Sequence, residues 1–401
     1  TLGQIRGWQA LLDIKDKDFL VECDATYKLS IKFTDFYQKG ESFHYPFGRP
    51  AIEPDDHLND WWGKKFLYPE TPYSEYAPCN YSQMALVNEN KCFFNEPSVI
   101  PFDFYRNTAF QFDATKFGLW LRDNVCIPAG LKHIKEEIKT IEQDKNGIKT
   151  LNKKYKADLF IDCTGFKSLL LEQTLKEPFI DLADTLPNNS TWATKIPYTD
   201  KRKQLVGYTN CTAVENGWIW NIPLWSRMGC GYVYSDKFIS DDDALKEFQK
   251  HIGTTELDFQ KIKFRTGIHQ RLWVKNVCAI GLSAGFIEPL ESNGLYSIHE
   301  FIHQLVRTLQ RGPVSQWDKD TFTVMCKGTY YGFMEFLAMH YSLSHRQDTP
   351  YWRDNFNRQW DEDVLNLVPV KPYEGFQRAI YDRGFNYSFP NDGGGLHCIA
   401  A

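Results

Sequence analysis

A lysine on a predicted strand is the first residue of this chain that could do chemistry. In the run Ala25–Phe36, apolar residues alternate with Lys28, Ser30 and Lys32, a pattern typical of a half-buried strand. A lysine on the polar face of such a strand is usually solvated. Lys28 could act as a functional amine only if that face lines a cavity instead of bulk water.

A carboxylate and a run of backbone amides form the second candidate. Glu291 is followed by Ser292, Asn293 and Gly294, which open a predicted helix that ends at Gly312. The first amides of a helix have no partner within the helix and favour an anion. A carboxylate at the start of a helix usually only interacts with the helix dipole, which stabilises the helix by about 0.3–1 kcal/mol.

Two tryptophans on one strand are the third candidate. In the run Gly217–Trp225, GWIWNIPLW, an extended chain places Trp218, Trp220 and Ile222 on one face, and Pro223 ends the strand. The two indoles then stand about 7 Å apart along the strand. They could simply fill a core, or they could form an aromatic wall that lines a channel.

The surrounding sequence predicts the elements that must position these residues. The run 157–162 is apolar up to Thr164 and Gly165, and a helix is expected over 168–175. The order strand, tight glycine turn, helix is typical of nucleotide-binding α/β folds. A buried strand over 276–282 leads in the same way into Ser283, Ala284 and Gly285. Four strand-like runs between 191 and 235 indicate an inserted antiparallel sheet.

Composition limits the class of protein. The 401 residues allow one large domain or two closely joined ones, and 42% apolar with 24% charged residues is ordinary for a globular protein. A net charge of -5 argues against a nucleic-acid partner. No apolar run reaches the roughly 18 residues of a membrane span. The ten cysteines are scattered singly, which favours buried thiols in the reducing cytoplasm over disulfides or a metal site.

Four motifs in order carry a family resemblance. The runs YKLSIKF, FIDCTGF, GWIWNIP with the following GYVYS, and AIGLSAGFIEPLES resemble those of the flavin-dependent halogenases of the tryptophan halogenase family, over residues 1 to about 311. The resemblance implies an α/β fold of the FAD-binding, glutathione-reductase-like type, with three layers, as in flavoprotein monooxygenases and halogenases. It also implies an inserted antiparallel sheet and a mostly helical substrate region.

The resemblance also divides the chain. Residues 1–401 are expected to form a single halogenase unit, with 25–310 as the FAD and catalytic core. Residues 311–401 are expected to be a helical substrate-side and late FAD-domain region. The glycine-rich FAD fingerprint GxGxxG is absent from the sequence, and we expect it to precede the first residue.

The implied chemistry uses reduced FAD, oxygen and a halide ion to make hypohalous acid, which then halogenates a small aromatic substrate. A separate flavin reductase supplies the FADH2. Lys28 resembles the lysine of the family that holds the hypohalous acid or forms a haloamine, and burial would lower its pKa and make both forms accessible. Glu291 resembles the carboxylate that orients the oxidant and takes the ring proton. Trp218 and Trp220, with Ile222 and Pro223, resemble the screen between substrate and cofactor.

The remaining site residues follow from the same motifs. Asn293 and Gly294 resemble the halide site. No metal is expected. The residues expected to contact FAD are Thr164, Gly165, Gly281, Ser283, Gly285 and Phe286.

Two departures from the family pattern refine these expectations. Asn293 stands where relatives typically carry Thr, which alters side-chain hydrogen bonding near the halide. The region after Arg311 is short and lacks an evident clamp for the amino and carboxylate groups of free tryptophan, so we expect a shorter, non-tryptophan type of member that acts on an indole or a phenol. The chain can form a homo-oligomer. Its bias toward Lys, Asn, Phe and Tyr is typical of AT-rich marine bacterial or phage genomes.

Two alternatives stay open. A flavin aromatic hydroxylase would share the fold but would need neither Lys28 nor the tryptophan pair. A non-enzymatic binding protein would stack sugars or apolar ligands on Trp218, Trp220 and the Trp61–Trp62 pair.

Overall fold

The computed structural model describes residues 1–48, 54–92, 102–105, 107–358 and 360. The chain forms two compact units, each described by itself. The first comprises residues 1–121, 190–262 and 335–401, and the second comprises 122–189 and 263–334. The expected boundary near residue 310 differs from this division, and residues 361–401 of the expected late region lie outside the described residues.

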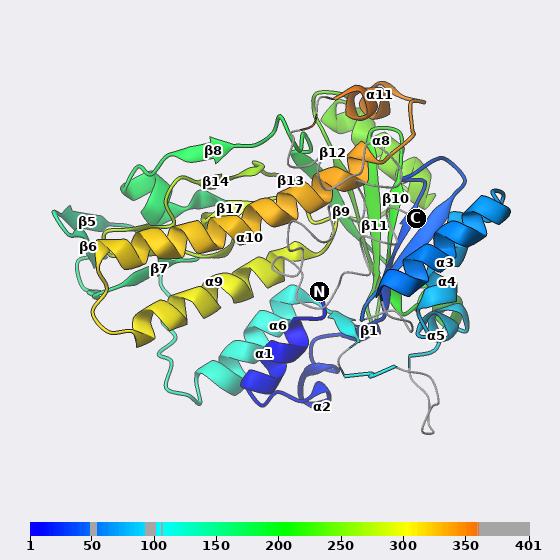
Figure 1. The fold of residues 1–401 in the computed structure, drawn as a ribbon. Helices are drawn as coiled ribbons and strands as arrows, with labels where there is room; N and C mark the ends of the chain where they lie inside the picture. The colour runs from blue at the N-terminus through cyan, green and yellow to red at the C-terminus, as the bar shows by residue number, and fades with distance from the viewer. Residues whose placement is uncertain (49–53, 93–101, 106, 359, 361–401) are drawn as a thin grey trace. The chain divides into compact units, whose positions relative to one another are not determined.

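A seven-stranded sheet is the centre of the first unit. Its order is β13-β9-β12-β11-β10-β2-β3, and Figure 1 shows the green strands β10, β11 and β12 close to the blue segment that holds β2 and β3. The strands are β2 (Ser30–Thr34), β3 (Ser42–Pro46), β9 (Ser190–Ile196), β10 (Tyr208–Ala213), β11 (Gly217–Pro223), β12 (Met228–Tyr234) and β13 (Gln260–Lys263).

The four inserted strands pair as predicted, and one expected strand is shorter. Strands β9, β12, β11 and β10 run antiparallel to their neighbours, and β10 pairs with β2 in parallel. The run expected to be a strand from Lys203 instead begins as a helical turn, because Asp200 caps the backbone of Lys203. The strand starts only at Tyr208.

Helices cover both faces of this sheet. Helix α8 (Asp241–Ile252) begins after Ser240, whose side chain accepts from the amide of Asp243, and it ends at Gly253. It packs on one face through Ala244 and Phe248. The end of α10 (Gln316–Ser342) covers the other face, where His340 lies 4.9 Å from Phe33.

The other elements of the first unit surround this sheet or carry its connections. Strands β1 (Thr26–Lys28) and β4 (Ala109–Gln111) form a separate antiparallel pair. The helices are α1 (Ile5–Leu11), α2 (Asp16–Phe19), α3 (Pro54–Leu67), η1 (Tyr73–Glu75), α4 (Tyr76–Asn80), α5 (Met84–Asn88), α6 (Ala114–Leu121), α7 (Lys201–Gln204) and α11 (Pro350–Asn357).

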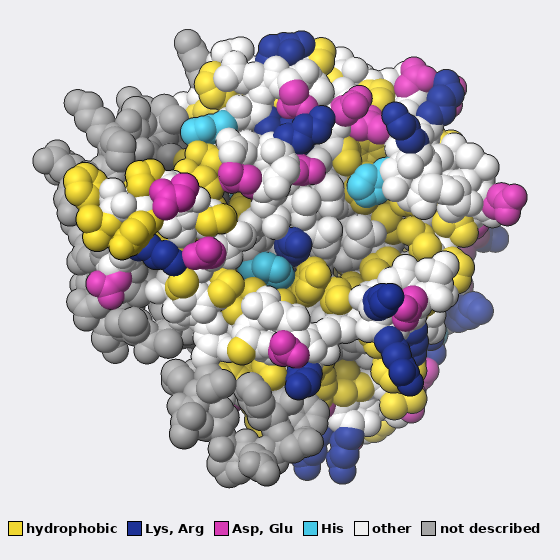
Figure 2. Space-filling model, turned by 90° about the vertical axis from the view of Figure 1, so that its right-hand side faces the viewer, with side chains coloured by type: hydrophobic (Ala, Val, Ile, Leu, Met, Phe, Trp, Pro, Cys, Tyr) yellow, Lys and Arg dark blue, Asp and Glu magenta, His cyan; other side chains and the backbone are white. Residues whose placement is uncertain are grey.

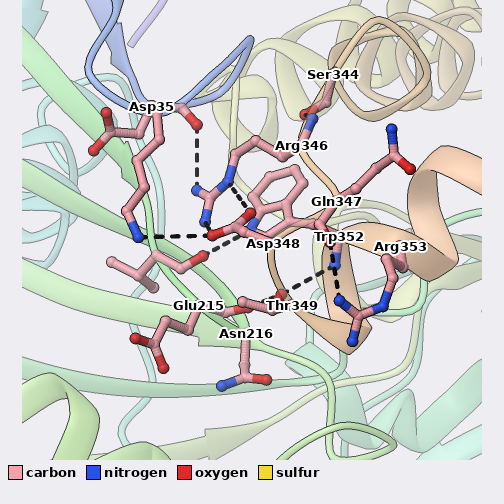
Figure 3. A network of polar contacts seen from close by, with 12 residues as sticks. Asp35, Glu215, Asn216, Ser344, Arg346, Gln347, Asp348, Thr349, Trp352 and Arg353 are labelled. Atoms are coloured by element: carbon pink, nitrogen blue, oxygen red, sulfur yellow. Dashed lines mark hydrogen bonds and ion pairs between the residues drawn. The ribbon is translucent and has the colours of Figure 1, made fainter.

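A polar network holds the segment after α10 against two loops of the sheet (Figure 3). The buried guanidinium of Arg346 makes two hydrogen bonds to Asp348, at 3.0 and 2.9 Å, and donates to the carbonyl of Asp35 at 3.2 Å. These hydrogen bonds from Arg346, and then its charge, hold the pKa of Asp348 below the usual value. The Thr349 hydroxyl donates to the carbonyl of Glu215 at 2.7 Å. These contacts hold the segment after α10 against the loop that follows β2 and the loop that follows β10.

The second unit is built from small sheets and two long helical segments. A three-stranded sheet in the order β15-β16-β7 contains one parallel pair, β7 with β16. Helix α9 (Asn293–Gln310) and most of α10 belong to this unit. The strands are β5 (Ile141–Asp144), β6 (Gly147–Leu151), β7 (Phe160–Asp162), β8 (Phe179–Asp181), β14 (Gly267–His269), β15 (Trp273–Val274), β16 (Val277–Ala279) and β17 (Gly285–Phe286), and the short helices are η2 (Arg122–Cys126), η3 (Gly165–Lys167), η4 (Leu169–Thr174) and η5 (Gly281–Ser283).

The surface shows charges of both signs. On the described part of the face in Figure 2, Lys and Arg side chains lie among Asp and Glu, with hydrophobic side chains between them. This mixture agrees with the net charge of -5. That nucleic acid is not a partner stays a prediction.

Two general expectations can be compared with the described residues. Within them, none of the helices has the length and hydropathy needed to cross a membrane. The cysteines there are free thiols, but Cys79 and Cys163 are exposed and Cys92 and Cys126 are partly exposed, so the expectation of buried thiols was wrong for these four.

Candidate functional site

Lys28 is enclosed by protein. The expected single strand over 25–36 breaks at Leu29, whose amide donates to the carbonyl of Gly207, so Lys28 lies on β1 and outside the large sheet. Its cross-strand partner is Ala109 on β4. The side chain is 0% exposed, and its ammonium donates to the carbonyl of Thr1 at 3.3 Å. Lys28 is therefore a buried amine and not part of a solvated strand face.

An aromatic ring that the sequence motifs did not identify lies next to this amine. The ring centre of Phe47 is 5.5 Å from the Lys28 ammonium, and the ring is buried. A cation beside an aromatic face gains electrostatic stabilisation, more so when water is excluded. The run FHYPFGRP has the prolines and aromatic residues of a loop, but its first four residues belong to strand β3, and the place of Phe47 beside Lys28 could not be derived from spacing.

The tryptophan pair lies on β11 as predicted. The ring centres of Trp218 and Trp220 are 5.9 Å apart, with Trp218 only 1% exposed and Trp220 half-buried. Trp220 faces Gly231 on β12, where a Cβ atom would overlap the indole. Ile222 is half-buried and Pro223 ends the strand. The structure therefore contains one aromatic surface, with room for Trp220 supplied by a neighbouring glycine.

The end of the tryptophan strand is hydrogen-bonded to the strands that carry Lys28. The Thr26 hydroxyl donates to the carbonyl of Pro223 at 2.7 Å, and the Gln111 amide donates to the same oxygen at 3.3 Å. The backbone amide of Trp225 donates to the carbonyl of Asp24 at 3.1 Å. Within the first unit, these bonds join β11 to the β1–β4 pair.

Glu291 lies in a tight backbone turn before α9. Its side chain is 1% exposed. This burial excludes the interpretation that Glu291 is a solvated carboxylate that only stabilises the helix dipole. The next residue, Ser292, has a φ of 58°, a left-handed conformation that is uncommon outside glycine. Nearby, the buried Glu288 accepts a hydrogen bond from the Asn188 amide at 2.8 Å. The turn therefore presents Glu291 in a fixed, water-poor setting.

The two residues expected to bind halide form the first turn of α9. The Asn293 side chain donates to the carbonyl of Glu288 at 3.3 Å, and the residue is 2% exposed. A Cβ atom at Gly294 would meet no atom within 4 Å, so its backbone faces open space. No side chain caps the helix. The helix start thus keeps an accessible glycine backbone where an anion would be favoured.

Two glycine turns stand at the carboxyl ends of the parallel pair. Gly165 follows β7 with a φ of 71°, and Gly281 follows β16 with a φ of 74°. The Ser168 hydroxyl donates to the carbonyl of Ser283 at 2.8 Å and thereby joins the two turns. A Cβ atom at Gly165 would also meet open space. Backbone exposed at the carboxyl ends of parallel strands is where α/β folds bind dinucleotides, so these turns fit FAD.

The other residues expected to contact FAD have clear structural partners. The Thr164 hydroxyl donates to Asp162 at 2.7 Å, and that carboxylate caps η4 through the amides of Leu170 and Leu171. Ser283 is fully buried, and its hydroxyl donates to the carbonyl of Ile280 at 3.0 Å.

Gly285 and Phe286 also have roles in packing. A Cβ atom at Gly285 would lie 2.6 Å from the carbonyl oxygen of Gly267 on β14, so close strand packing explains this glycine. The Phe286 ring contacts the rings of Phe166 and Phe264 at 5.3 and 5.0 Å. Contacts of all four residues with a flavin stay predictions.

A further motif on α9 has the spacing of a zinc-protease helix. His299, Glu300 and His303 read HEFIH, and burial lowers the pKa of His299 to about 4. A catalytic zinc ion needs three protein ligands. The described residues contain no group of three or more His, Cys, Asp or Glu that could hold a metal ion. The motif is therefore not assigned a role.

These features define the class of protein. The parallel strand pair, its glycine turns and the large, mostly antiparallel sheet are those of a nucleotide-binding α/β protein with an aromatic strand in its inserted sheet.

Comparison with known proteins then gives the family. The family model for tryptophan halogenase matches residues 1–372, so the chain belongs to the tryptophan halogenase family and is a flavin-dependent halogenase with an FAD-binding fold. The recognition made from the four sequence motifs is confirmed.

Named relatives and solved structures agree. The chain is 34% identical to tryptophan 6-halogenase ThaL of Streptomyces albogriseolus, covering 89% of this chain and 70% of the relative. It is 31% identical to tryptophan 7-halogenase RebH of Lentzea aerocolonigenes, covering 86% and 68%. The apo structure of VirX1 matches with a TM-score of 0.89 and 37% identity, covering 100% of this chain and 80% of that one. Tryptophan 6-halogenase SttH of Streptomyces toxytricini matches with a TM-score of 0.82 and 30% identity, covering 92% and 75%. Nothing in these comparisons favours the hydroxylase or the binding protein.

The predicted site residues divide between the two units. Lys28 and the tryptophan strand belong to the first unit, and Glu291, the halide residues and the FAD turns belong to the second. Within each unit the structure brings its own set together. That Lys28 and Glu291 serve one pocket stays a prediction.

Proposed function

We propose that this flavin-dependent halogenase acts on a small, electron-rich aromatic compound such as an indole or a phenol, with Lys28 and Glu291 as its catalytic residues. The observation that carries the proposal is the burial of the Lys28 ammonium beside the Phe47 ring. Burying an amine is costly unless function or pairing requires it. An enclosed amine is suited to holding a reactive neutral oxidant.

FAD fits the glycine turns after β7 and β16, where Gly165 and Gly281 would hold it through backbone. When bound in its reduced form, FAD supplies with oxygen the oxidising power that converts halide to hypohalous acid. A separate flavin reductase provides the reduced cofactor in the cytoplasm. Asn293 and Gly294 would hold the halide at the start of α9, which offers the positive end of the helix dipole.

Lys28 then acts on the hypohalous acid. Its ammonium donates a hydrogen bond to the oxygen of the acid, which orients the halogen toward the substrate and polarises the oxygen–halogen bond. A ring carbon attacks the halogen, the oxygen–halogen bond breaks with its electron pair going to oxygen, and the departing hydroxide takes a proton from the Lys28 ammonium and leaves as water. The ammonium regains a proton when Glu291 releases the one that it takes from the ring. The tryptophan pair on β11 keeps the substrate apart from the cofactor.

Glu291 completes the substitution. Its carboxylate accepts the proton from the ring carbon that has gained the halogen, and aromaticity returns. The balance is one aromatic C–H and one hypohalous acid giving one carbon–halogen bond and one water. A carboxylate in a water-poor turn is positioned to act as this base without competition from solvent.

The test is product analysis with matched lysine variants. The full-length protein is incubated with FAD, NADH, a flavin reductase, bromide and a panel of indole, phenol and free tryptophan, and products are measured by mass spectrometry. We expect a monobrominated indole or phenol, its loss in Lys28→Ala, and its retention in Lys32→Ala, which removes the other lysine of the same motif. FAD absorbance should be unchanged in both variants. An unbrominated panel, or equal activity in Lys28→Ala and Lys32→Ala, would refute the proposal.

A further inference from the structure

The side of β1 opposite Lys28 carries a cluster that the proposed reaction does not use. Arg6 on α1 pairs with Asp16 on α2 at 2.5 Å, and the Tyr27 hydroxyl donates to the other oxygen of Asp16 at 3.0 Å. We call Arg6, Asp16 and Tyr27 the Arg6 clamp. The side chains of Arg6 and Asp16 are only 12% and 16% exposed. The clamp therefore joins two helices to the strand of Lys28 in a largely buried setting.

The clamp also holds the partner strand. The Arg6 guanidinium lies 4.2 Å from the ring centre of Phe110, which is the cross-strand partner of Tyr27. The same guanidinium donates to the hydroxyl of Thr108, the residue just before β4. Stacking on an aromatic ring and a planar fork of donors are properties of Arg that Lys does not share. One side chain thus contacts both strands of the pair.

The register explains why this matters for Lys28. Tyr27 pairs with Phe110, and Lys28 pairs with Ala109. The clamp therefore contacts the β1–β4 strand pair at the residue next to Lys28. Successive residues of a strand point to opposite faces. The clamp can therefore fix β1 from the face opposite the Lys28 side chain. Burial, then the charge of Asp16, raises the pKa of Tyr27, so its hydroxyl keeps the proton that it donates.

We propose that Arg6, Asp16 and Tyr27 are positioning residues that set the place of the Lys28 ammonium. The proposal rests on the proposed role of Lys28. Strand β1 has only three residues and stands outside the seven-stranded sheet, so its own ladder gives it little support. The clamp adds side-chain contacts to the β4 pairing and to the hydrogen bonds that Thr26 and Asp24 make with the end of the tryptophan strand.

The clamp should therefore affect the use of hypohalous acid on the substrate and not the formation of hypohalous acid. In the proposed reaction, Lys28 acts only after hypohalous acid has formed, and it acts through an ammonium at a defined place. A displacement of about 1 Å can cost up to about 100-fold in a positioned reaction. Loosening the clamp should therefore release hypohalous acid instead of stopping its formation.

The test measures that partition in the full-length protein. Brominated indole and brominated monochlorodimedone, a scavenger in solution, are quantified together for wild type, Tyr27→Phe, Asp16→Asn, Arg6→Lys and Lys28→Ala. Tyr105→Phe is the matched control, because Tyr105 also lies near Arg6, at 5.8 Å, but is 69% exposed. Thermal midpoints are recorded for each protein.

We expect Tyr27→Phe and Asp16→Asn to lower brominated indole by about tenfold while total oxidant, indole product plus scavenger product, stays at the wild-type level. Arg6→Lys should give a fall at least as large, because lysine lacks the planar fork that contacts both strands, and Tyr105→Phe should give none.

Two results would overturn the inference. One is an unchanged partition in Tyr27→Phe and Asp16→Asn. The other is a parallel fall of total oxidant and thermal midpoint, which would make the clamp structural only. If Lys28→Ala itself partitions like wild type, the proposed function fails, and this inference fails with it.

Discussion

The two regions that carry the proposed catalytic residues are built in different ways. Lys28 is held by side chains from elements distant in sequence, including Phe47 and the Arg6 clamp. Glu291 is held by local backbone, in a turn with a left-handed Ser292 just before α9. The first region depends on tertiary packing and the second on the conformation of a short segment. Mutations should therefore affect them differently.

The largest expected effect is on the chemistry of Glu291. Glu291→Gln keeps the shape of the side chain and the backbone turn but removes the base. We expect kcat to fall by about 10²–10⁴, the usual contribution of a general base, with an unchanged thermal midpoint. Steady-state kinetics and a melting curve on the same sample check this. A loss of stability equal to the loss of activity would show that the turn needs the charge.

The next effect tests side-chain packing in the first unit. Gly231→Ala places a methyl group against the Trp220 indole. Overpacking of this kind typically costs about 1–3 kcal/mol. Urea unfolding should show a loss in that range, whereas Gly294→Ala, which meets open space in the first turn of α9, should change stability by less than about 0.5 kcal/mol. Equal effects would remove the contrast between the two regions.

The left-handed residue tests the backbone of the second region. Ser292→Gly should leave stability unchanged or raise it by up to about 1 kcal/mol, because glycine adopts a φ of 58° without strain. Ser292→Val should lower stability by about 1–2 kcal/mol. Unfolding curves of the pair give the difference directly. If both variants behave alike, the turn is not set by backbone conformation.

The motif-bearing segments were the part of the molecule that sequence could predict. The tryptophan strand ended by Pro223 and the start and end of α9 follow from local signals and were found in place. The break at Leu29 and the burial of Lys28 could not be predicted, because they depend on Gly207, Phe47 and other residues far along the chain. Periodicity reports which residues share a face and not what covers that face.

A pH dependence of stability compares one buried histidine from each unit. Burial, and then the nearby charge of Lys32, lowers the pKa of His44 in the first unit to about 3, against an ordinary 6.5. The unfolded chain then binds a proton that the folded chain does not. Stability is therefore full above pH 6.5 and falls as pH drops toward 3, by at most about 1.4 kcal/mol per pH unit.

His299 on α9 gives the matching measurement in the second unit. Its pKa of about 4 confines its contribution to the window between pH 6.5 and 4. Urea unfolding between pH 7 and 4 should flatten to a similar extent in His44→Gln and His299→Gln, and between pH 4 and 3 His44→Gln should be flatter than His299→Gln. A wild-type curve without slope in this window, or the reverse order of the two variants, would show that these histidines are not held neutral as described.

The partition of oxidant in Lys28→Ala tests the central claim most directly. Brominated indole and brominated scavenger are measured together, with Lys32→Ala as the control. We predict that Lys28→Ala makes as much total oxidant as wild type but delivers almost none of it to indole. Brominated indole at the wild-type share of total oxidant in Lys28→Ala would contradict the assignment of this buried amine as the group that captures hypohalous acid.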